Sequence, residues 1–197
     1  MVQRIYERVR LNSINNMIFT HTKIKGVYII DPEPRTDERG YFERIYCMDE
    51  LKKQGIKFKI VQINHVMSLK KGTIRGLHMQ KPPKSEDKLI QCIRGSIFDV
   101  VIDLRKKSPT YGKWVSVVLS EKNKKMLFIP KGFMHGYQVL ENNSSVQYPV
   151  SEFYSPTTVM GIKWDDPYFN IAWPIKKAIL SETDKNWPLF KPAAHIS

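Results

Sequence analysis

Hydrophobic and polar side chains alternate along three segments in the middle of the chain, residues 97–104, 114–120 and 146–150. An alternation with a period of two is typical of a β-strand, because successive side chains point to opposite faces of a sheet. In the last segment this pattern places Val146 and Tyr148 on one face. The three segments are therefore predicted to be strands.

Turn-forming residues separate these segments, and helical patterns are scarce. Glycine, proline, asparagine and lysine clusters stand at residues 71–72, 94–95, 108–109, 121–125, 130–132, 142–143 and 155–156. One short helix is expected over residues 49–54, stopping at Gly55. Short strands at this spacing predict an antiparallel sandwich or barrel, onto which the proline-rich C-terminal third packs as loop and short helix.

A length of 197 residues corresponds to one ordinary domain. Residues 1–16 are polar and mixed in charge, whereas a cleaner apolar pattern begins at Met17. We therefore expect an N-terminal extension over residues 1–16 and a single domain over residues 17–197. The apolar fraction of 42% suits a packed globular core and excludes fibrous and fully disordered classes.

The chain has 32 lysines and arginines against 19 aspartates and glutamates, a net charge of +13. Such an excess favours an anionic partner, such as nucleic acid, an anionic membrane or a phosphorylated small molecule, although it also suits a merely soluble surface. The basic residues are scattered, and the sequence has no basic helix, RNA-binding aromatic motif or zinc-finger spacing. We therefore expect no nucleic-acid partner.

Membrane and export signals are missing from the sequence. No apolar run approaches the roughly 20 residues of a membrane span, and residues 1–16 lack the apolar centre of a secretory signal. The two cysteines, Cys47 and Cys92, lie far apart and outside any metal-ligand spacing. We expect no membrane partner and a cytoplasmic location, where thiols stay reduced.

Two of the five histidines stand in unusual settings. His78 ends a run in which Ile74, Gly76 and His78 are expected to share one strand face, and the glycine would leave room for a ligand beside the imidazole. His135 lies next to Gly136 near the start of another expected strand. A buried, hydrogen-bonded histidine is the ordinary alternative for each.

A catalytic metal is not expected. Barrels of this kind often hold a metal through a His-x-His pair, but Met79 and Gln80 follow His78. Zinc or iron needs further nitrogen or carboxylate ligands at close spacing, and none is present.

Other polar residues suit chemistry and ordinary structure equally well. They are Arg39, Gln62, Asn64, Arg75, Lys88, Tyr148, Tyr154 and Asp184. Lys88 would be a solvated charge at a strand edge, and Tyr148 a core aromatic with its hydroxyl at the rim. Asp184 completes a helix capping box that starts at Ser181. Residue type alone does not decide between these roles.

Several motifs, in order along the chain, resemble those of the dTDP-4-dehydrorhamnose 3,5-epimerase family. They include Asp37-Glu38-Arg39-Gly40-Tyr41-Phe42, Gln62-x-Asn64, Arg75-Gly76-Leu77-His78-x-Gln80, Lys88-Leu89, Ile129-Pro130-x-Gly132-Phe133-x-His135-Gly136, Phe153-Tyr154, Gly161-Ile162-x-Trp164 and Leu180-Ser181-x-x-Asp184. The resemblance runs from about residue 26 to residue 184, which is most of the chain.

The resemblance implies an all-β fold, a double-stranded β-helix or cupin jelly roll with short flanking helices. It implies a cofactor-independent isomerase that epimerises C3 and C5 of dTDP-4-dehydro-6-deoxy-D-glucose, giving dTDP-4-dehydro-L-rhamnose. It also implies a homodimer with a nucleotide-diphosphate sugar as substrate, in dTDP-rhamnose biosynthesis for lipopolysaccharide O-antigen.

The same resemblance implies roles for individual residues. His78 would be the general base with Asp184 as its orienting partner, and Tyr148 would be the general acid. Lys88 would stabilise the enolate. The nucleotide-sugar site would be lined by Arg39, Gln62, Asn64, Arg75, His135 and Tyr154.

Some positions depart from the family pattern. Arg44 stands where an acidic residue is usual, and Pro149 replaces a lysine after the expected acid. Three alternatives therefore stay open: a 3-epimerase, a 3,4-ketoisomerase acting on a related nucleotide-sugar, and a cupin that binds a sugar nucleotide without turnover. An acid and a base on opposite faces favour an enzyme, because a binding module needs neither.

Overall fold

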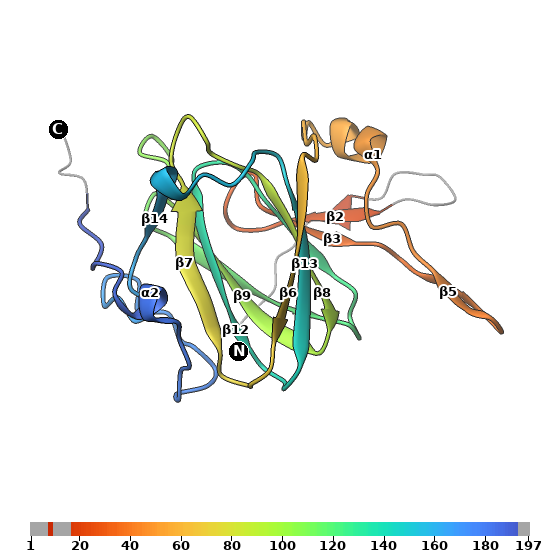
Figure 1. Cartoon of the computed structure of the whole chain (residues 1–197). Helices are drawn as coiled ribbons and strands as arrows, with labels where there is room; N and C mark the ends of the chain where they lie inside the picture. Colours follow the sequence, from red (N-terminus) through yellow and green to blue (C-terminus); the bar gives the residue numbers. More distant parts are fainter. Residues whose placement is uncertain (1–7, 10–16, 193–197) are drawn as a thin grey trace.

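The computed structural model describes residues 8–9 and 17–192, most of which form two antiparallel β-sheets facing each other (Figure 1). The larger sheet joins, in spatial order, β1 (Arg8–Val9), β2 (Ile18–His21), β3 (Tyr28–Asp31), β11 (Met126–Ile129), β8 (Lys88–Arg94), β13 (Ser144–Val150) and β6 (Gln62–Ser68). The smaller sheet joins β10 (Trp114–Ser120), β9 (Ser96–Asp103), β12 (Phe133–Val139), β7 (Ile74–Gln80) and β14 (Val159–Gly161). The predicted all-β jelly roll is confirmed.

Few other elements accompany the two sheets. A hairpin of β4 (Arg35–Asp37) and β5 (Gly40–Phe42) projects away from them (Figure 1). The helices are α1 (Met48–Lys53) and α2 (Glu182–Lys185), with a 3₁₀ turn at Pro156–Thr158. The predicted helix over residues 49–54 is therefore confirmed as α1, one residue earlier. The three segments predicted from alternation are strands β9, β10 and β13.

The expected N-terminal extension falls largely outside the described residues. Within it, β1 pairs with β2 in antiparallel fashion, so this pair of residues belongs to the larger sheet. No helix among residues 8–9 and 17–192 is long and apolar enough to cross a membrane.

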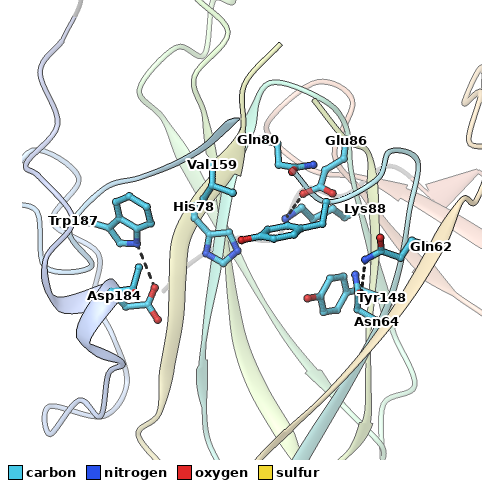
Figure 2. A pocket seen from close by; sticks show the side chains of 12 residues that line it. Gln62, Asn64, His78, Gln80, Glu86, Lys88, Tyr148, Val159, Asp184 and Trp187 are labelled. Atoms are coloured by element: carbon cyan, nitrogen blue, oxygen red, sulfur yellow. Dashed lines mark hydrogen bonds and ion pairs between the residues drawn. The ribbon is translucent and has the colours of Figure 1, made fainter. Parts of the chain in front are cut away.

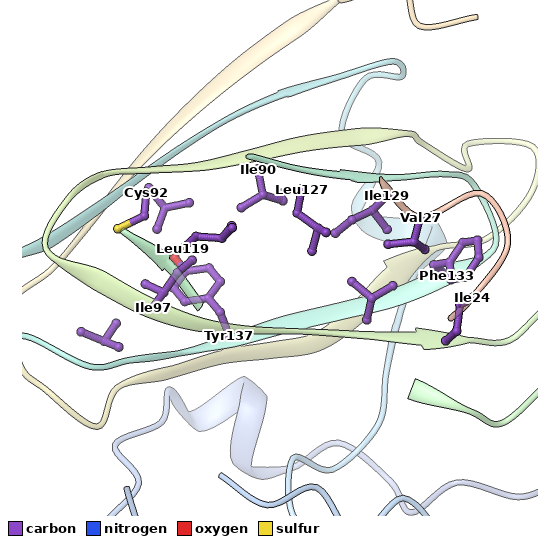
Figure 3. Close-up of a cluster of buried hydrophobic side chains, with 13 residues drawn as sticks. Ile24, Val27, Ile90, Cys92, Ile97, Leu119, Leu127, Ile129, Phe133 and Tyr137 are labelled. Carbon is purple, nitrogen blue, oxygen red and sulfur yellow. The ribbon is translucent and has the colours of Figure 1, made fainter. Parts of the chain in front are cut away.

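The main core lies between the two sheets (Figure 3). Ile90 of β8 and Leu127 of β11 meet Val101 of β9 and Val139 of β12, all of them fully buried. Each strand contributes every second residue to this layer, as the period of two requires. Burying an aliphatic side chain of this size contributes about 1.5–3 kcal/mol, so the interior layer holds the sheets together.

Further clusters cover the outer faces of the sheets. On the larger sheet, Leu51 of α1 packs with Phe128 of β11. On the smaller sheet, the C-terminal segment lays Phe169 and Trp173 over Ile102. Strand β9 is therefore apolar on both faces because both are buried, and the prediction that the C-terminal third packs onto the barrel is confirmed.

Strand β7 departs from simple alternation. His78 pairs with His135 across from β12, but Arg75 pairs with Tyr137, so three residues of β7 span two of its neighbour. This is a β-bulge, which reverses the side-chain parity along a strand. The expectation that Ile74 and His78 share a face is wrong: His78 shares its face with Arg75.

Gly76, the glycine in this bulge, does not have the role expected from the sequence, which was to leave room for a ligand beside His78. A Cβ at Gly76 would lie 2.6 Å from the carbonyl oxygen of His135 and 2.8 Å from the Cα of Gly136. The backbones of β7 and β12 thus occupy the space that a side chain would need. Gly76 serves this close approach between strands and does not make room for a ligand.

Candidate active site

A cavity of about 400 Å³ opens between the larger and the smaller sheet, where β6 faces β7 (Figure 2). Strands β6, β7, β8 and β13 line it, together with the loop after β13 and the helix α2. The lining residues are Gln62, Asn64, His78, Gln80, Glu86, Lys88, Tyr148, Tyr154, Val159, Thr183, Asp184 and Trp187. Most of these side chains are polar, in contrast to the apolar layer deeper between the sheets.

The cavity brings together seven of the ten residues predicted from the sequence. These are Gln62, Asn64, His78, Lys88, Tyr148, Tyr154 and Asp184. They come from positions more than 120 residues apart in the chain, so only the sheet pairing makes them neighbours. Arg39, Arg75 and His135 do not line the cavity.

His78 lies in the centre of the site, on the inward face of β7. Figure 2 shows it with Asp184 on one side and Tyr148 on the other. Burial, the ammonium of Lys88 and the neighbouring His135 together lower the pKa of His78 to about 3. The imidazole is therefore neutral at neutral pH and able to accept a proton.

Asp184 lies beside His78 at the first turn of α2, but its partners are local. Its Oδ2 accepts a hydrogen bond from Ser181 Oγ at 2.8 Å, and its Oδ1 accepts one from Trp187 Nε1 at 3.3 Å. Ser181 Oγ in turn accepts from the backbone N–H of Asp184, which confirms the predicted helix cap. Within the described residues no hydrogen bond joins Asp184 to His78.

Lys88 is buried on the inward face of β8. It is 6% exposed, which contradicts the alternative of a solvated strand-edge charge. Its Nζ lies 3.0 Å from Oε1 of Glu86, whose side chain is 12% exposed. A buried ammonium needs such a partner, because an unpaired charge in a protein interior is strongly unfavourable. The pair holds one positive and one negative charge at the cavity wall.

Tyr148 stands opposite His78 on β13. Its ring packs against the core layer that contains Val146, which confirms that the two side chains share a face. Burial and the carboxylate of Glu86 raise the pKa of Tyr148, with a smaller opposing effect of Arg75. The phenol is therefore protonated at neutral pH and able to donate a proton.

Gln62 and Asn64 form the side of the cavity next to Tyr148. They share one face of β6, and Gln62 Nε2 donates to Asn64 Oδ1 at 2.7 Å. The remaining amide N–H groups and carbonyl oxygen of the pair can bind the hydroxyls of a sugar or the edge of a nucleobase.

His135 lies behind the cavity wall, not in it. It is 5% exposed, and its Nε2 lies 3.0 Å from Oδ2 of Asp99, a fully buried carboxylate. Burial raises the pKa of Asp99, although His135 opposes that effect. His135 is paired directly with His78 in the sheet register, and it contributes to the lowered pKa of His78.

The two predicted substrate-binding arginines also lie outside the cavity. Arg75 is exposed and donates to Ser68 Oγ at 3.0 Å and to the Met67 carbonyl at 3.3 Å. It thus ties β7 to β6 across the opening between the sheets. Arg39 lies at the turn of the projecting hairpin, where it forms an exposed ion pair with Asp37 at 2.6 Å.

Several cavity residues were not predicted from the sequence. Glu86 lies two positions before Lys88, in the segment that leads into β8, and a carboxylate this close to a lysine was an available signal. Trp187 packs directly over Gly161, where a Cβ would clash with its ring. Thr183 and Val159 carry no chemical signal of their own, and only the fold brings them to the cavity.

The described residues contain no cluster of three or more histidine, cysteine, aspartate or glutamate side chains arranged to hold a metal ion. What the cavity does offer is a neutral imidazole, a protonated phenol and an ammonium group. Such a set suits removal and return of a proton at a carbon next to a carbonyl group.

Most of the similar known proteins are named dTDP-4-dehydrorhamnose 3,5-epimerase, and some are named as 3-epimerases. The family model described as dTDP-4-dehydrorhamnose 3,5-epimerase matches residues 21–192. The enzyme of that name from Methanothermobacter thermautotrophicus is 45% identical over 172 residues, covering 86% of this chain and 92% of the relative.

Solved structures agree with the sequence comparison. The dTDP-4-dehydrorhamnose 3,5-epimerase from Bacillus anthracis, with TDP and pyrophosphate bound, has a TM-score of 0.87 and 40% identity, covering 89% of this chain and 100% of that one. The enzyme from Legionella pneumophila in complex with dTDP-4-keto-L-rhamnose has a TM-score of 0.84 and 37% identity. The match covers 88% of this chain and 93% of that one.

Proposed function

The chain belongs to the dTDP-4-dehydrorhamnose 3,5-epimerase family, and we propose that its cavity epimerises C3 and C5 of dTDP-4-dehydro-6-deoxy-D-glucose. The product is dTDP-4-dehydro-L-rhamnose, and the protein is an isomerase. The ligand-bound relatives, one with TDP and one with the keto-rhamnose product, support a nucleotide-sugar as the substrate.

The chemistry requires a base and an acid, and we propose that it uses no cofactor. The C4 ketone acidifies the hydrogens at C3 and C5, so a base can remove either one and leave an enolate. Returning a proton to the opposite face inverts the carbon. A positive group near the C4 oxygen lowers the barrier, because it stabilises the charge that develops there.

One observation carries the proposal: an imidazole and a phenol face each other in one cavity, which a buried ammonium also lines (Figure 2). A lowered pKa keeps His78 neutral, and a raised pKa keeps Tyr148 protonated. Environments that push two pKa values apart are typical of acid–base pairs in enzymes. We therefore assign proton removal to His78 and proton return to Tyr148.

The other cavity residues support these two. The buried ammonium of Lys88 is the group available to stabilise the enolate. Asp184 lies beside His78. We propose that its carboxylate orients the imidazole once substrate is bound, and that it stabilises the positive charge which the imidazole gains on removing a proton. Gln62, Asn64 and Tyr154 are proposed to hold the nucleotide-sugar, while Arg75 and His135 support the walls from outside.

Arg39 reaches the site only if a second subunit contributes it. It lies on the hairpin that projects from the sheets (Figure 1) and does not line the cavity of its own chain. Tyr41 and Phe42 on the same hairpin are 59% and 63% exposed. Exposed aromatic side chains of this kind favour a hairpin surface that another protein chain covers. We therefore propose a homodimer in which the hairpin of each subunit lies against the other and brings Arg39 to the partner's cavity.

The setting of the enzyme is also a proposal. Cys47 and Cys92 are both free thiols, as expected for a protein of the reducing cytoplasm. Supply of dTDP-rhamnose for lipopolysaccharide O-antigen follows from the family resemblance. The alternative activities are not favoured, because the 45% identical relative is itself a 3,5-epimerase.

The proposal is tested by turnover of dTDP-4-dehydro-6-deoxy-D-glucose in deuterated water, with the labelled carbons identified by NMR. His78→Asn is expected to lose both exchange and epimerisation, by about 10²–10⁴-fold, because no proton is removed. Tyr148→Phe is expected to keep some exchange but to lose inversion, because the proton can return only to the face it left.

Tyr137→Phe is the matched control. It removes another buried phenol that faces the core but does not line the cavity, so turnover should stay close to that of the wild type. A wild-type protein that leaves both carbons unlabelled would refute the proposed function. Inversion at the wild-type rate by Tyr148→Phe would instead refute only the assignment of the acid.

A further inference from the structure

Gln80 is the last residue of β7, two positions after His78. Its side chain lies at the edge of the cavity (Figure 2) and is 3% exposed. The sequence motif that contains it gave it no role. A buried amide must satisfy its own donors and acceptor, so its partners indicate what it holds in place.

All the hydrogen bonds of this amide go to loop backbones. Nε2 donates to the Phe153 carbonyl at 3.2 Å, and Oε1 accepts from the Ser155 N–H at 2.6 Å. These two groups stand immediately before and after Tyr154. Nε2 also donates to the Lys84 carbonyl at 3.0 Å. One side chain therefore fastens the peptide units on both sides of Tyr154.

Tyr154 itself stands on an exposed loop. It lines the cavity, yet it is 66% exposed and lies in the loop between β13 and the 3₁₀ turn. An ion pair between Lys84 and Glu152, at 3.3 Å, adds a partly exposed contact between the same two loops. Exposed pairs of this kind contribute little. Hydrogen bonds of Ser151 to Asp87 and of Thr158 to the Ser155 carbonyl hold the two ends of the loop. Among the described side chains, that of Gln80 is the one that binds both peptide units next to Tyr154.

We propose that Gln80 is a positioning residue that sets where Tyr154 stands in the cavity relative to His78, and so determines how well the nucleotide-sugar is held for proton transfer. This rests on the proposed function, since it concerns the same substrate. The amide is well suited to the task because it bridges the strand of the base and the loop of Tyr154. A displacement of about 1 Å at a reacting centre can cost up to 10²-fold in rate.

The chain offers a matched control for this amide. Gln138 is fully buried in the neighbouring strand β12, where its Nε2 donates to the Ile175 carbonyl at 2.8 Å and its Oε1 accepts from the Ile175 N–H at 2.9 Å. It fastens a backbone segment in the same manner, but it does not line the cavity. Gln80→Met and Gln138→Met thus remove comparable buried amides at different places.

The experiment compares kcat and KM of these variants on dTDP-4-dehydro-6-deoxy-D-glucose, together with their melting temperatures. Both variants should lose stability, because backbone groups are left without partners. Only Gln80→Met should also lose kcat/KM, by about 10–100-fold. If both variants retain the wild-type kcat/KM, the proposal is refuted.

A double-mutant cycle separates positioning from a general structural effect. In a Tyr154→Ala background, Gln80→Met should cause no further loss of kcat/KM, because the residue through which it acts is already missing. Gln138→Met should have the same small effect in both backgrounds. Independent, multiplying losses for Gln80→Met and Tyr154→Ala would overturn the proposal.

Gln80→Glu extends the test if Gln80→Met does not fold. It keeps the volume and the acceptor for the Ser155 N–H but removes the amide donors, so its kcat/KM should fall below that of the wild type and again depend on Tyr154. If Gln80→Glu is fully active in a protein that keeps Tyr154, this result would count against the proposal that Gln80 positions Tyr154. An inactive wild type and an inactive Gln138→Met would instead refute the proposed function itself.

Discussion

The chemistry of single side chains in this cavity is governed by the cost of burying charge. His78 stays neutral because water is excluded and because Lys88 and His135 lie nearby. The Nζ of Lys88 lies 3.0 Å from a carboxylate oxygen of Glu86. The cavity thus holds a neutral imidazole beside an ammonium group that suits an enolate.

The depressed pKa of His78 predicts how stability depends on pH. The folded-state pKa is about 3 and the ordinary value is 6.5, so the unfolded chain binds this proton first as the pH falls. The contribution of His78 to stability is therefore complete above pH 6.5 and is lost as the pH falls toward 3. Between pH 7.5 and pH 5 the loss should be about 1–2 kcal/mol.

Urea denaturation at the two pH values checks this expectation. His78→Asn should show a smaller fall in unfolding free energy between them than the wild type does. His21→Asn, which changes an exposed histidine of β2, serves as the control and should follow the wild type. An equal pH dependence in His78→Asn and the wild type would contradict the prediction.

Among the elements, β7 carries much of the site. It supplies His78 to the cavity, Arg75 to the bridge toward β6 and Gln80 to the loop of Tyr154. The bulge at Gly76 lets Arg75 and His78 face inward together. A regular strand would turn one of the two outward.

The bulge predicts an unequal response to alanine at two glycines. Gly76 and Gly55 both have positive φ, at 103° and 74°. A Cβ at Gly76 meets the backbone of β12 at 2.6 Å, whereas at Gly55 it meets none of the described atoms within 4 Å. Gly55→Ala should cost about 1–2 kcal/mol, from the backbone conformation alone.

Gly76→Ala should cost about 3 kcal/mol or more, because it adds a backbone collision to that strain. It should also reduce turnover, since β12 can yield only by shifting β7 and His78 with it. Chemical denaturation and kinetics of the two variants check both points. Equal destabilisation by Gly55→Ala and Gly76→Ala would show that crowding at the bulge is unimportant.

At the scale of the whole molecule, the outer face of the larger sheet exposes apolar side chains that a single chain leaves in water. Ile63 and Met67 of β6 and Ile93 of β8 are between 41% and 59% exposed. Strand β6 is also an edge of its sheet, and free edges favour pairing. These features support the proposed homodimer independently of the hairpin.

Mixing two inactive variants tests whether Arg39 acts across the dimer. In a heterodimer of Arg39→Ala and His78→Asn subunits, one cavity would contain His78 and receive Arg39 from the other subunit. Co-refolded mixtures should therefore recover about a quarter of the wild-type turnover for random pairing in a two-fold dimer. Light scattering should give the mass of two chains.

A mixture of His78→Asn and Tyr148→Phe is the control, because both residues belong to one cavity and no intact site can form. It should stay inactive. A monomeric mass at micromolar concentration would refute the dimer. Dimers without recovery in the first mixture would place the function of Arg39 in its own subunit.

Much of the fold follows from local sequence pattern. Alternation over two residues depends only on where successive side chains point. It was therefore sufficient to predict β9, β10 and β13, and to place Val146 and Tyr148 on one face. The helix cap at Ser181 was predictable for the same reason, since donor and acceptor are three residues apart.

Tertiary structure alone decided what depends on distant strands. The inward face of His78 follows from a bulge against β12, which local alternation does not reveal. Its pKa depends on burial and on Lys88 and His135, whose distances are set by sheet pairing. The clamp of Gln80 joins residues 73 and 75 positions apart. Contacts of this kind are formed by folding, and no periodicity along the chain encodes them.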